Sequence, residues 1–131
     1  MTARRQTAMV ICPGRGVYNA SELGYFHRHH TDRLDLLEGF DSHRTQKGET
    51  SLAGLDSADR FVLSKFTRGD NASGLIYACS YADFLSIDQS KYDIVAVTGN
   101  SMGWYTALAC GGALSGDAGF EVVNTMGAIM Q

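Results

Sequence analysis

A serine lies between two glycines in the segment Gly99-Asn100-Ser101-Met102-Gly103, and this pattern limits the folds that the chain can adopt. The residues before it, 92–97 (YDIVAV), predict a strand, and the small-residue-rich stretch 102–114 after it predicts a helix. A G-x-S-x-G run between a strand and a helix is typical of a nucleophile elbow, whose flanking glycines remove side chains that would clash. The Ser101 hydroxyl is then expected at a helix N-terminus, where positive partial charge and the N–H of Met102 favour a developing oxyanion. The alternative is an ordinary strand-to-helix turn with a capping serine.

A second glycine-rich turn follows the other strand-like segment. Residues 7–12 (TAMVIC) are short and apolar, and they end at Pro13-Gly14-Arg15-Gly16. In a parallel sheet this turn emerges at the same carboxyl edge as Ser101, where backbone N–H groups can approach a ligand closely. The alternative is a simple connecting loop. The turn does not match a phosphate-binding loop, because neither G-x-x-x-x-G-K-[ST] nor G-x-G-x-x-G is present.

The remaining segments predict helices between and after the two strands. Amphipathic patterns over about 21–40 and 56–66 predict helices, and the polar segment 41–50 between them predicts a loop. After a predicted break at 68–71, residues 72–86 predict a long buried helix. Ser115 or Asp117 is expected to cap a last helix that runs to Gln131. Strands alternating with helices predict a single α/β domain, 1–131, with a parallel sheet. A sheet of only two strands is marginally stable, and the apolar stripe of the last helix continues to the final residue. We therefore expect this sequence to be a piece of a larger chain or of a two-piece protein.

Composition excludes several classes of function. The chain has 131 residues and a net charge of −3, which leaves no electrostatic footprint for nucleic acid. The longest apolar run, residues 8–12, is far too short to span a membrane, so we expect a soluble, cytoplasmic protein. The three cysteines are widely spaced and are expected to be buried, reduced thiols rather than disulfide or zinc ligands. The histidines of residues 27–30 are expected on an exposed polar helix face, with no metal site.

Four segments in order resemble one known family: CPGRG, NASGLIYACSYADF, GNSMGWYTALACGGALS and MGAIMQ. Together they are similar to the N-terminal part of malonyl-CoA:acyl carrier protein transacylases, whose fold also serves as the acyltransferase domain of fatty-acid and polyketide synthases. The resemblance covers nearly all 131 residues but only about the first half of a family member. It implies a hydrolase-like parallel sheet with flanking helices, here an incomplete acyltransferase fold.

The resemblance also implies a reaction. Ser101 would attack an acyl-CoA thioester, and the acyl-serine would be passed to the phosphopantetheine thiol of an acyl carrier protein. The N–H groups of Met102 and of Arg15, which stands at the glutamine position of the family's P-G-Q-G loop, would form the oxyanion hole. Coenzyme A and phosphopantetheine thioesters are expected as substrates, with no permanently bound cofactor. The expected substrate pocket contains Gly14, Gly16, Asn100 and Met126.

Two positions depart from the family pattern. Asn100 stands where the family has a histidine before the nucleophile. Met126 replaces the arginine that opens the family's R-G-x-x-M-Q pattern and pairs with the malonyl carboxylate, and no arginine occurs after Arg68. A buried carboxylate without a partner costs about 3–5 kcal/mol, or more than two decades in binding. We therefore expect an uncharged acyl group rather than malonyl.

The general base is missing from this part of the family pattern. A nucleophilic serine needs a proton acceptor, usually a histidine, and in the family that histidine lies beyond the last residue here. The four histidines of this chain all precede residue 44. We expect the base to come from a missing C-terminal segment or a second chain. Two alternatives remain open: a serine thioesterase or esterase, and a catalytically incomplete module that binds a carrier protein or partner chain.

Overall fold

The computed structural model describes residues 4–130, which form a mixed α/β arrangement around a two-stranded sheet. The strands are β1 (Gln6–Cys12) and β2 (Tyr92–Gly99). The α-helices are α1 (Tyr25–His29), α2 (Leu34–Gln46), α3 (Leu52–Asp56), α4 (Leu63–Phe66), α5 (Gly69–Leu85), α6 (Gly103–Cys110) and α7 (Gly116–Ile129). Two short 3₁₀ helices, η1 (Ala20–Glu22) and η2 (Thr31–Arg33), flank α1. No helix between residues 4 and 130 has the length and hydropathy that a membrane crossing requires.

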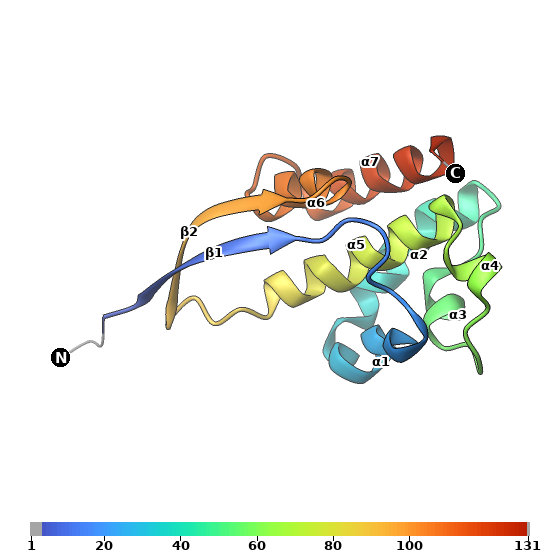
Figure 1. Ribbon diagram of the computed structural model, residues 1–131, viewed down its shortest axis with the longest axis horizontal. Helices are drawn as coiled ribbons and strands as arrows, with labels where there is room; N and C mark the ends of the chain where they lie inside the picture. Colours follow the sequence, from blue (N-terminus) through green and yellow to red (C-terminus); the bar gives the residue numbers. More distant parts are fainter. Residues whose placement is uncertain (1–3, 131) are drawn as a thin grey trace.

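The sheet is parallel, as the sequence predicts. Gln6 lies opposite Tyr92 and Cys12 opposite Gly99, with an irregularity between Ala8 and Met9. Helix α5 returns the chain along the strands, so that β1 and β2 end at the same edge (Figure 1). This arrangement fixes the relative position of the two glycine-rich turns, because each turn begins where its strand stops.

The core lies among the helices rather than over the sheet. Buried side chains of α2, α3, α5 and α7 form one cluster, which includes Phe40, Leu75, Tyr77 and Phe120. A smaller cluster of Cys12, Ala107 and Cys110 joins β1 to α6. The opposite face of the sheet is open to solvent, and Met9, Ile11 and Val95 are each about 60% exposed or more. Most of the buried apolar side chains therefore belong to the helices.

Three predicted segments differ from the structure. The expected helix over 21–40 is interrupted, because Gly24 takes a left-handed φ of 85° and a non-helical His30 separates α1 from η2. The expected loop over 41–50 is helical as far as Gln46, the end of α2. The expected helix over 56–66 is two short helices, α3 and α4, joined by irregular backbone.

A buried arginine explains why α2 ends later and α5 begins earlier than predicted. The Arg44 guanidinium, with no exposed surface, donates to the carbonyls of Thr50 and Asp70 and to the side-chain oxygens of Asn71 and Asn124. These bonds hold the last turn of α2 against the first turn of α5, where the sequence predicts a break at 68–71. Burial lowers the pKa of Arg44, and nearby carboxylates oppose that effect. Satisfied hydrogen bonds are what allow a charged group to lie in such a place.

Two local predictions are confirmed, the cap of the last helix and the state of the cysteines. The Ser115 hydroxyl accepts a hydrogen bond from the Ala118 N–H at 3.0 Å and so caps α7. All three cysteines, Cys12, Cys79 and Cys110, are buried free thiols.

Candidate active site

The turn between β2 and α6 is a sharp bend centred on Ser101. This serine has a φ of 55° and is the one non-glycine residue in 4–130 with a positive φ. The bend is closed by hydrogen bonds from the Gly103 N–H to the Asn100 carbonyl, 2.9 Å, and from the Trp104 N–H to the Ser101 carbonyl, 3.1 Å. A left-handed conformation costs an L-residue about 1–2 kcal/mol. Ser101 is exposed, so this strained residue presents its side chain to solvent rather than to the core.

The glycines on either side of Ser101 are required by close backbone contacts. A Cβ on Gly99 would collide with the backbone of Gly103, and a Cβ on Gly103 would collide with the carbonyl of Cys12. Backbone cannot move aside as the end of a long side chain can. The glycines of the G-x-S-x-G pattern therefore let the start of α6 lie directly on the ends of both strands.

The 13–16 turn lies against this bend. The Asn100 N–H donates to the Cys12 carbonyl at 3.0 Å, which joins the two strand ends. A Cβ on Gly14 would lie 2.7 Å from the Asn100 carbonyl oxygen and 3.2 Å from the Ser101 Cβ. Gly16 has a φ of 101°, which glycine adopts without strain. Gly14, Asn100 and Ser101 are thus brought together at one edge of the sheet, and Gly16 lies two residues after Gly14 in the same turn.

Two backbone donors at this edge have no acceptor among the described residues. Within residues 4–130, neither the Met102 N–H nor the Arg15 N–H donates a hydrogen bond. Met102 directly precedes the eight-residue helix α6, whose N-terminus carries a partial positive charge. Its side chain is buried and lines, with Gly14 and Val123, a space of about 10 Å³ beneath the turn. The Met102 N–H follows Ser101 directly in the chain, and the Arg15 N–H lies in the turn whose Gly14 packs on Ser101. Backbone N–H groups without an acceptor stabilise a developing oxyanion where they converge on it.

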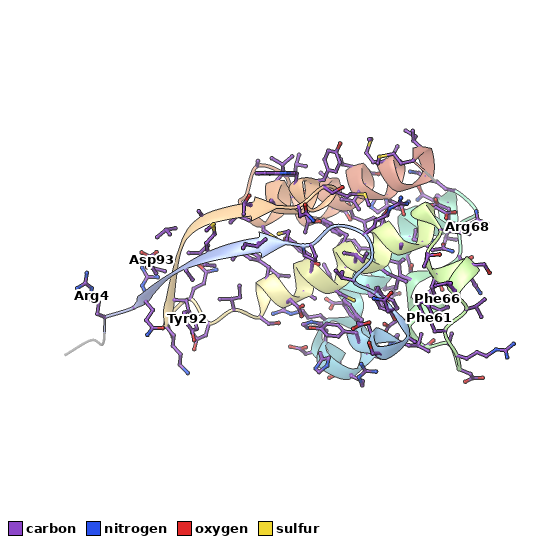
Figure 2. All side chains as sticks on the ribbon, in the orientation of Figure 1. Arg4, Phe61, Phe66, Arg68, Tyr92 and Asp93 are labelled. Atoms are coloured by element: carbon purple, nitrogen blue, oxygen red, sulfur yellow. The ribbon has the colours of Figure 1, made fainter. Side chains whose placement is uncertain are left out.

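A groove of about 280 Å³ begins at the 13–16 turn. Arg15 and Gly16 form one side of it, and Phe66, Ala72 and Ile76 form an apolar wall. Phe66 packs on Phe61 with ring centroids 4.9 Å apart, and both rings lie beside α4 (Figure 2). Ile76 also borders a smaller space of about 110 Å³ beside Tyr25 and Cys79. Tyr18 and Ile76 border both spaces.

Met126 is not brought to the turn by any described contact. It lies half-buried on α7, one turn after Val123, and its carbonyl accepts a hydrogen bond from the Met130 N–H. It does not line the three spaces described above. Its place in a substrate pocket stays a prediction of the sequence.

The histidines are engaged elsewhere, and the expectation of an exposed polar face at 27–30 is wrong for His30, which is buried. His27 Nδ1 lies 2.6 Å from Asp56 Oδ2, and His30, only 3% exposed, has its Nε2 2.7 Å from Asp83 Oδ1. His43 lies between Asp117 and Glu121, each 3.0 Å away, and the His29 ring packs on Tyr25. Within residues 4–130, no histidine makes a hydrogen bond to Ser101.

The sequence reasoning missed a buried network around Asp56. This carboxylate has no exposed side-chain surface and accepts from the Tyr18 hydroxyl at 2.5 Å and from the His27 N–H at 2.9 Å. Burial, together with the hydrogen bond to Asp56, raises the pKa of Tyr18. Tyr18 follows the 13–16 turn and lines the groove beside Arg15, so the network anchors one end of that turn. Because Tyr18 and Asp56 are 38 residues apart, no local pattern could indicate their contact.

Comparisons with protein-family models, with curated proteins and with solved structures give no match for this chain. The site must be interpreted from its own geometry.

Proposed function

We propose that the chain is the N-terminal part of an acyltransferase that moves an acyl group from coenzyme A to the phosphopantetheine thiol of an acyl carrier protein, within a hydrolase-like α/β fold. One observation carries the proposal: an exposed serine in a strained left-handed conformation, in contact with a second glycine-rich turn. The four sequence segments that resemble malonyl-CoA:acyl carrier protein transacylases include both turns.

In the proposed reaction the thioester carbonyl lies over Ser101, with its oxygen toward the N–H groups of Met102 and Arg15. The Ser101 oxygen bonds to the carbonyl carbon, the carbon–sulfur bond breaks, and coenzyme A leaves with the proton that the serine gives up. The carrier-protein thiol then attacks the acyl-serine and restores the hydroxyl. The general base, a histidine in the resembled family, is proposed to come from polypeptide outside these 131 residues or from a second chain.

We infer that the acyl group is uncharged. Met126 offers an apolar side chain where the resembled family has an arginine, and the groove beside Arg15 has an apolar wall of Phe66, Ala72 and Ile76. Octanoyl-CoA is therefore expected to label the protein faster than malonyl-CoA. Met126→Arg is expected to shift this ratio toward malonyl by about tenfold or more, because it restores a partner for the carboxylate. Faster labelling of the unaltered protein by malonyl-CoA than by octanoyl-CoA contradicts the inference.

The test of the serine is the intact mass of the full chain after incubation with acyl-CoA. A single acyl adduct is expected, absent from Ser101→Ala and retained by Ser42→Ala, which removes an exposed hydroxyl in the middle of α2. An adduct that persists in Ser101→Ala removes the nucleophile from the proposal. No adduct on any form, with or without the missing polypeptide, favours the non-enzymatic alternative, a module that binds a carrier protein or partner chain.

The second enzymatic alternative is a serine thioesterase or esterase, in which water accepts the acyl group. The lifetime of the acyl-serine separates it from the transferase, since a transferase must exclude water until the thiol arrives. A transferase adduct persists in buffer and disappears when pantetheine is added. An adduct lost equally fast with and without pantetheine identifies a hydrolase.

A further inference from the structure

Two of the three cysteines form a pair that the proposed function does not use. Cys12, at the end of β1, and Cys110, at the end of α6, lie 98 residues apart in the sequence with their sulfurs 4.0 Å apart. Both are free thiols in the cluster that joins the sheet to α6. A disulfide needs an S–S distance of about 2 Å, so its formation requires the two sulfurs, now 4.0 Å apart, to approach by about 2 Å.

The environment of the pair favours reaction at one sulfur. The hydrogen bond between the thiols lowers the pKa of Cys12, and it raises the pKa of Cys110, as burial also does. Cys110 lines an open groove of about 510 Å³ along β2 and α6, together with Val97, Leu108 and Gly111. A small oxidant that enters this groove approaches the Cys110 sulfur, which lies 4.0 Å from the Cys12 sulfur. The thiolate is the form of cysteine that reacts with oxidants, and a second thiol 4.0 Å away can then resolve a sulfenic acid.

Cys79 provides an internal comparison. It is 8% exposed, like Cys110, and it borders the space of about 110 Å³ beside Tyr25. It has no sulfur partner within residues 4–130, and burial raises its pKa. Exposure alone therefore does not distinguish Cys79 from the pair, whereas the sulfur–sulfur contact does.

We propose that Cys12 and Cys110 are a reversible dithiol–disulfide site that hydrogen peroxide oxidises. One thiolate attacks a peroxide oxygen, the O–O bond breaks, and a sulfenic acid and water form. The other sulfur then bonds to the sulfenic sulfur and a second water leaves, so that two thiols and one peroxide give one disulfide and two waters. A dithiol reductant reverses the reaction by thiol–disulfide exchange.

The bond would act on the edge of the sheet that holds Ser101. The Cys12 carbonyl accepts the hydrogen bond from Asn100, and Gly103 packs on the same carbonyl. A disulfide would thus tie the strand end beneath the Ser101 turn to the far end of α6. This inference does not depend on the proposed acyl transfer, because it rests only on the two sulfurs and their surroundings.

The test is limited oxidation of the full chain with hydrogen peroxide, followed by denaturation, alkylation and tryptic mapping. Each cysteine lies on a different tryptic peptide, 6–15, 69–91 or the one that begins at Tyr92, so each is counted separately. The expected product is monomeric and about 2 Da lighter, with the first and last peptides linked. Cys12 and Cys110 lose alkylation together, roughly tenfold faster than Cys79, and dithiothreitol restores both.

Three variants complete the design. Cys79→Ala and Ser101→Ala are expected to keep the linkage, and the latter separates this site from the proposed nucleophile. Cys110→Ala is expected to leave Cys12 without a partner and so to give no lighter species. Three results in the unaltered protein overturn the proposal: independent loss of the two thiols, a disulfide between chains, or a disulfide that includes Cys79. Each result is measured without any variant.

Discussion

At Ser101 the backbone and the proposed chemistry favour different residue types. A φ of 55° suits glycine, but glycine has no nucleophilic side chain, and the proposed attack on a thioester requires one. Strained backbone that persists at one position is characteristic of functional sites, where the surrounding contacts hold the residue in place. Here those contacts are the hydrogen bonds on either side of the bend and the packing of Gly14 and Gly103.

Replacement of this serine by glycine is expected to raise stability while it removes the nucleophile. Ser101→Gly relieves the left-handed strain, and because Ser101 is exposed it loses little packing. The free energy of unfolding, measured with urea, is expected to rise by about 1 kcal/mol. Ser101→Ala keeps the strain and serves as the control, with stability close to the unaltered protein. A loss of stability in the glycine variant contradicts the strained bend.

Among the helices, α1 is held to α5 through the side chain of Tyr25. Its hydroxyl donates to the Asp83 carboxylate, at 3.0 and 2.9 Å from the two oxygens. Burial, with the hydrogen bond and the charge of Asp83, raises the pKa of Tyr25 to about 12 from the ordinary 10.0. A raised pKa in the folded state means that the contribution to stability is complete below pH 10 and is lost as the pH rises toward 12.

The stability of the protein is therefore expected to fall between pH 10 and 12, and part of this fall belongs to Tyr25. Tyr25→Phe removes the titrating group, so its urea midpoint should change less between pH 9 and pH 11 than that of the unaltered protein. Tyr92→Phe is the matched control, because Tyr92 is 40% exposed and its hydroxyl makes no hydrogen bond within residues 4–130. Equal pH dependence of all three proteins refutes the assignment.

Elements specified by local pattern could be predicted, and elements held by distant partners could not. The two strands, the bend at Ser101 and the Ser115 cap follow from glycine spacing, apolar runs and a capping residue, which are all local signals. The end of α2 depends on Arg44, whose bonds reach Asp70 and Asn124. The buried Asp56 network likewise joins residues 29 to 38 positions apart. Single-sequence periodicity carries no information on such contacts.

Across the molecule, burial is distributed unevenly between the helices and the sheet. Leu75 of α5 is 1% exposed, whereas Ile11 of β1 is 67% exposed. Leu75→Ala is expected to cost about 2–5 kcal/mol of unfolding free energy. Ile11→Ala is expected to cost about 1 kcal/mol or less, which is the span of strand propensities. Equal losses on urea unfolding contradict an open sheet face and indicate that another chain covers it.

The most direct test of the Ser101 bend removes the need for a general base. A thiol at a helix N-terminus ionises more readily, so Ser101→Cys can attack a thioester without a histidine. The measurement is the rate at which octanoyl-CoA acylates Ser101→Cys, compared with Ser42→Cys on exposed mid-helix surface and with Ser101→Ala as background. We predict a rate at least about tenfold higher at position 101, from the lowered thiol pKa and the oxyanion donors. Equal rates at positions 101 and 42 would contradict the account.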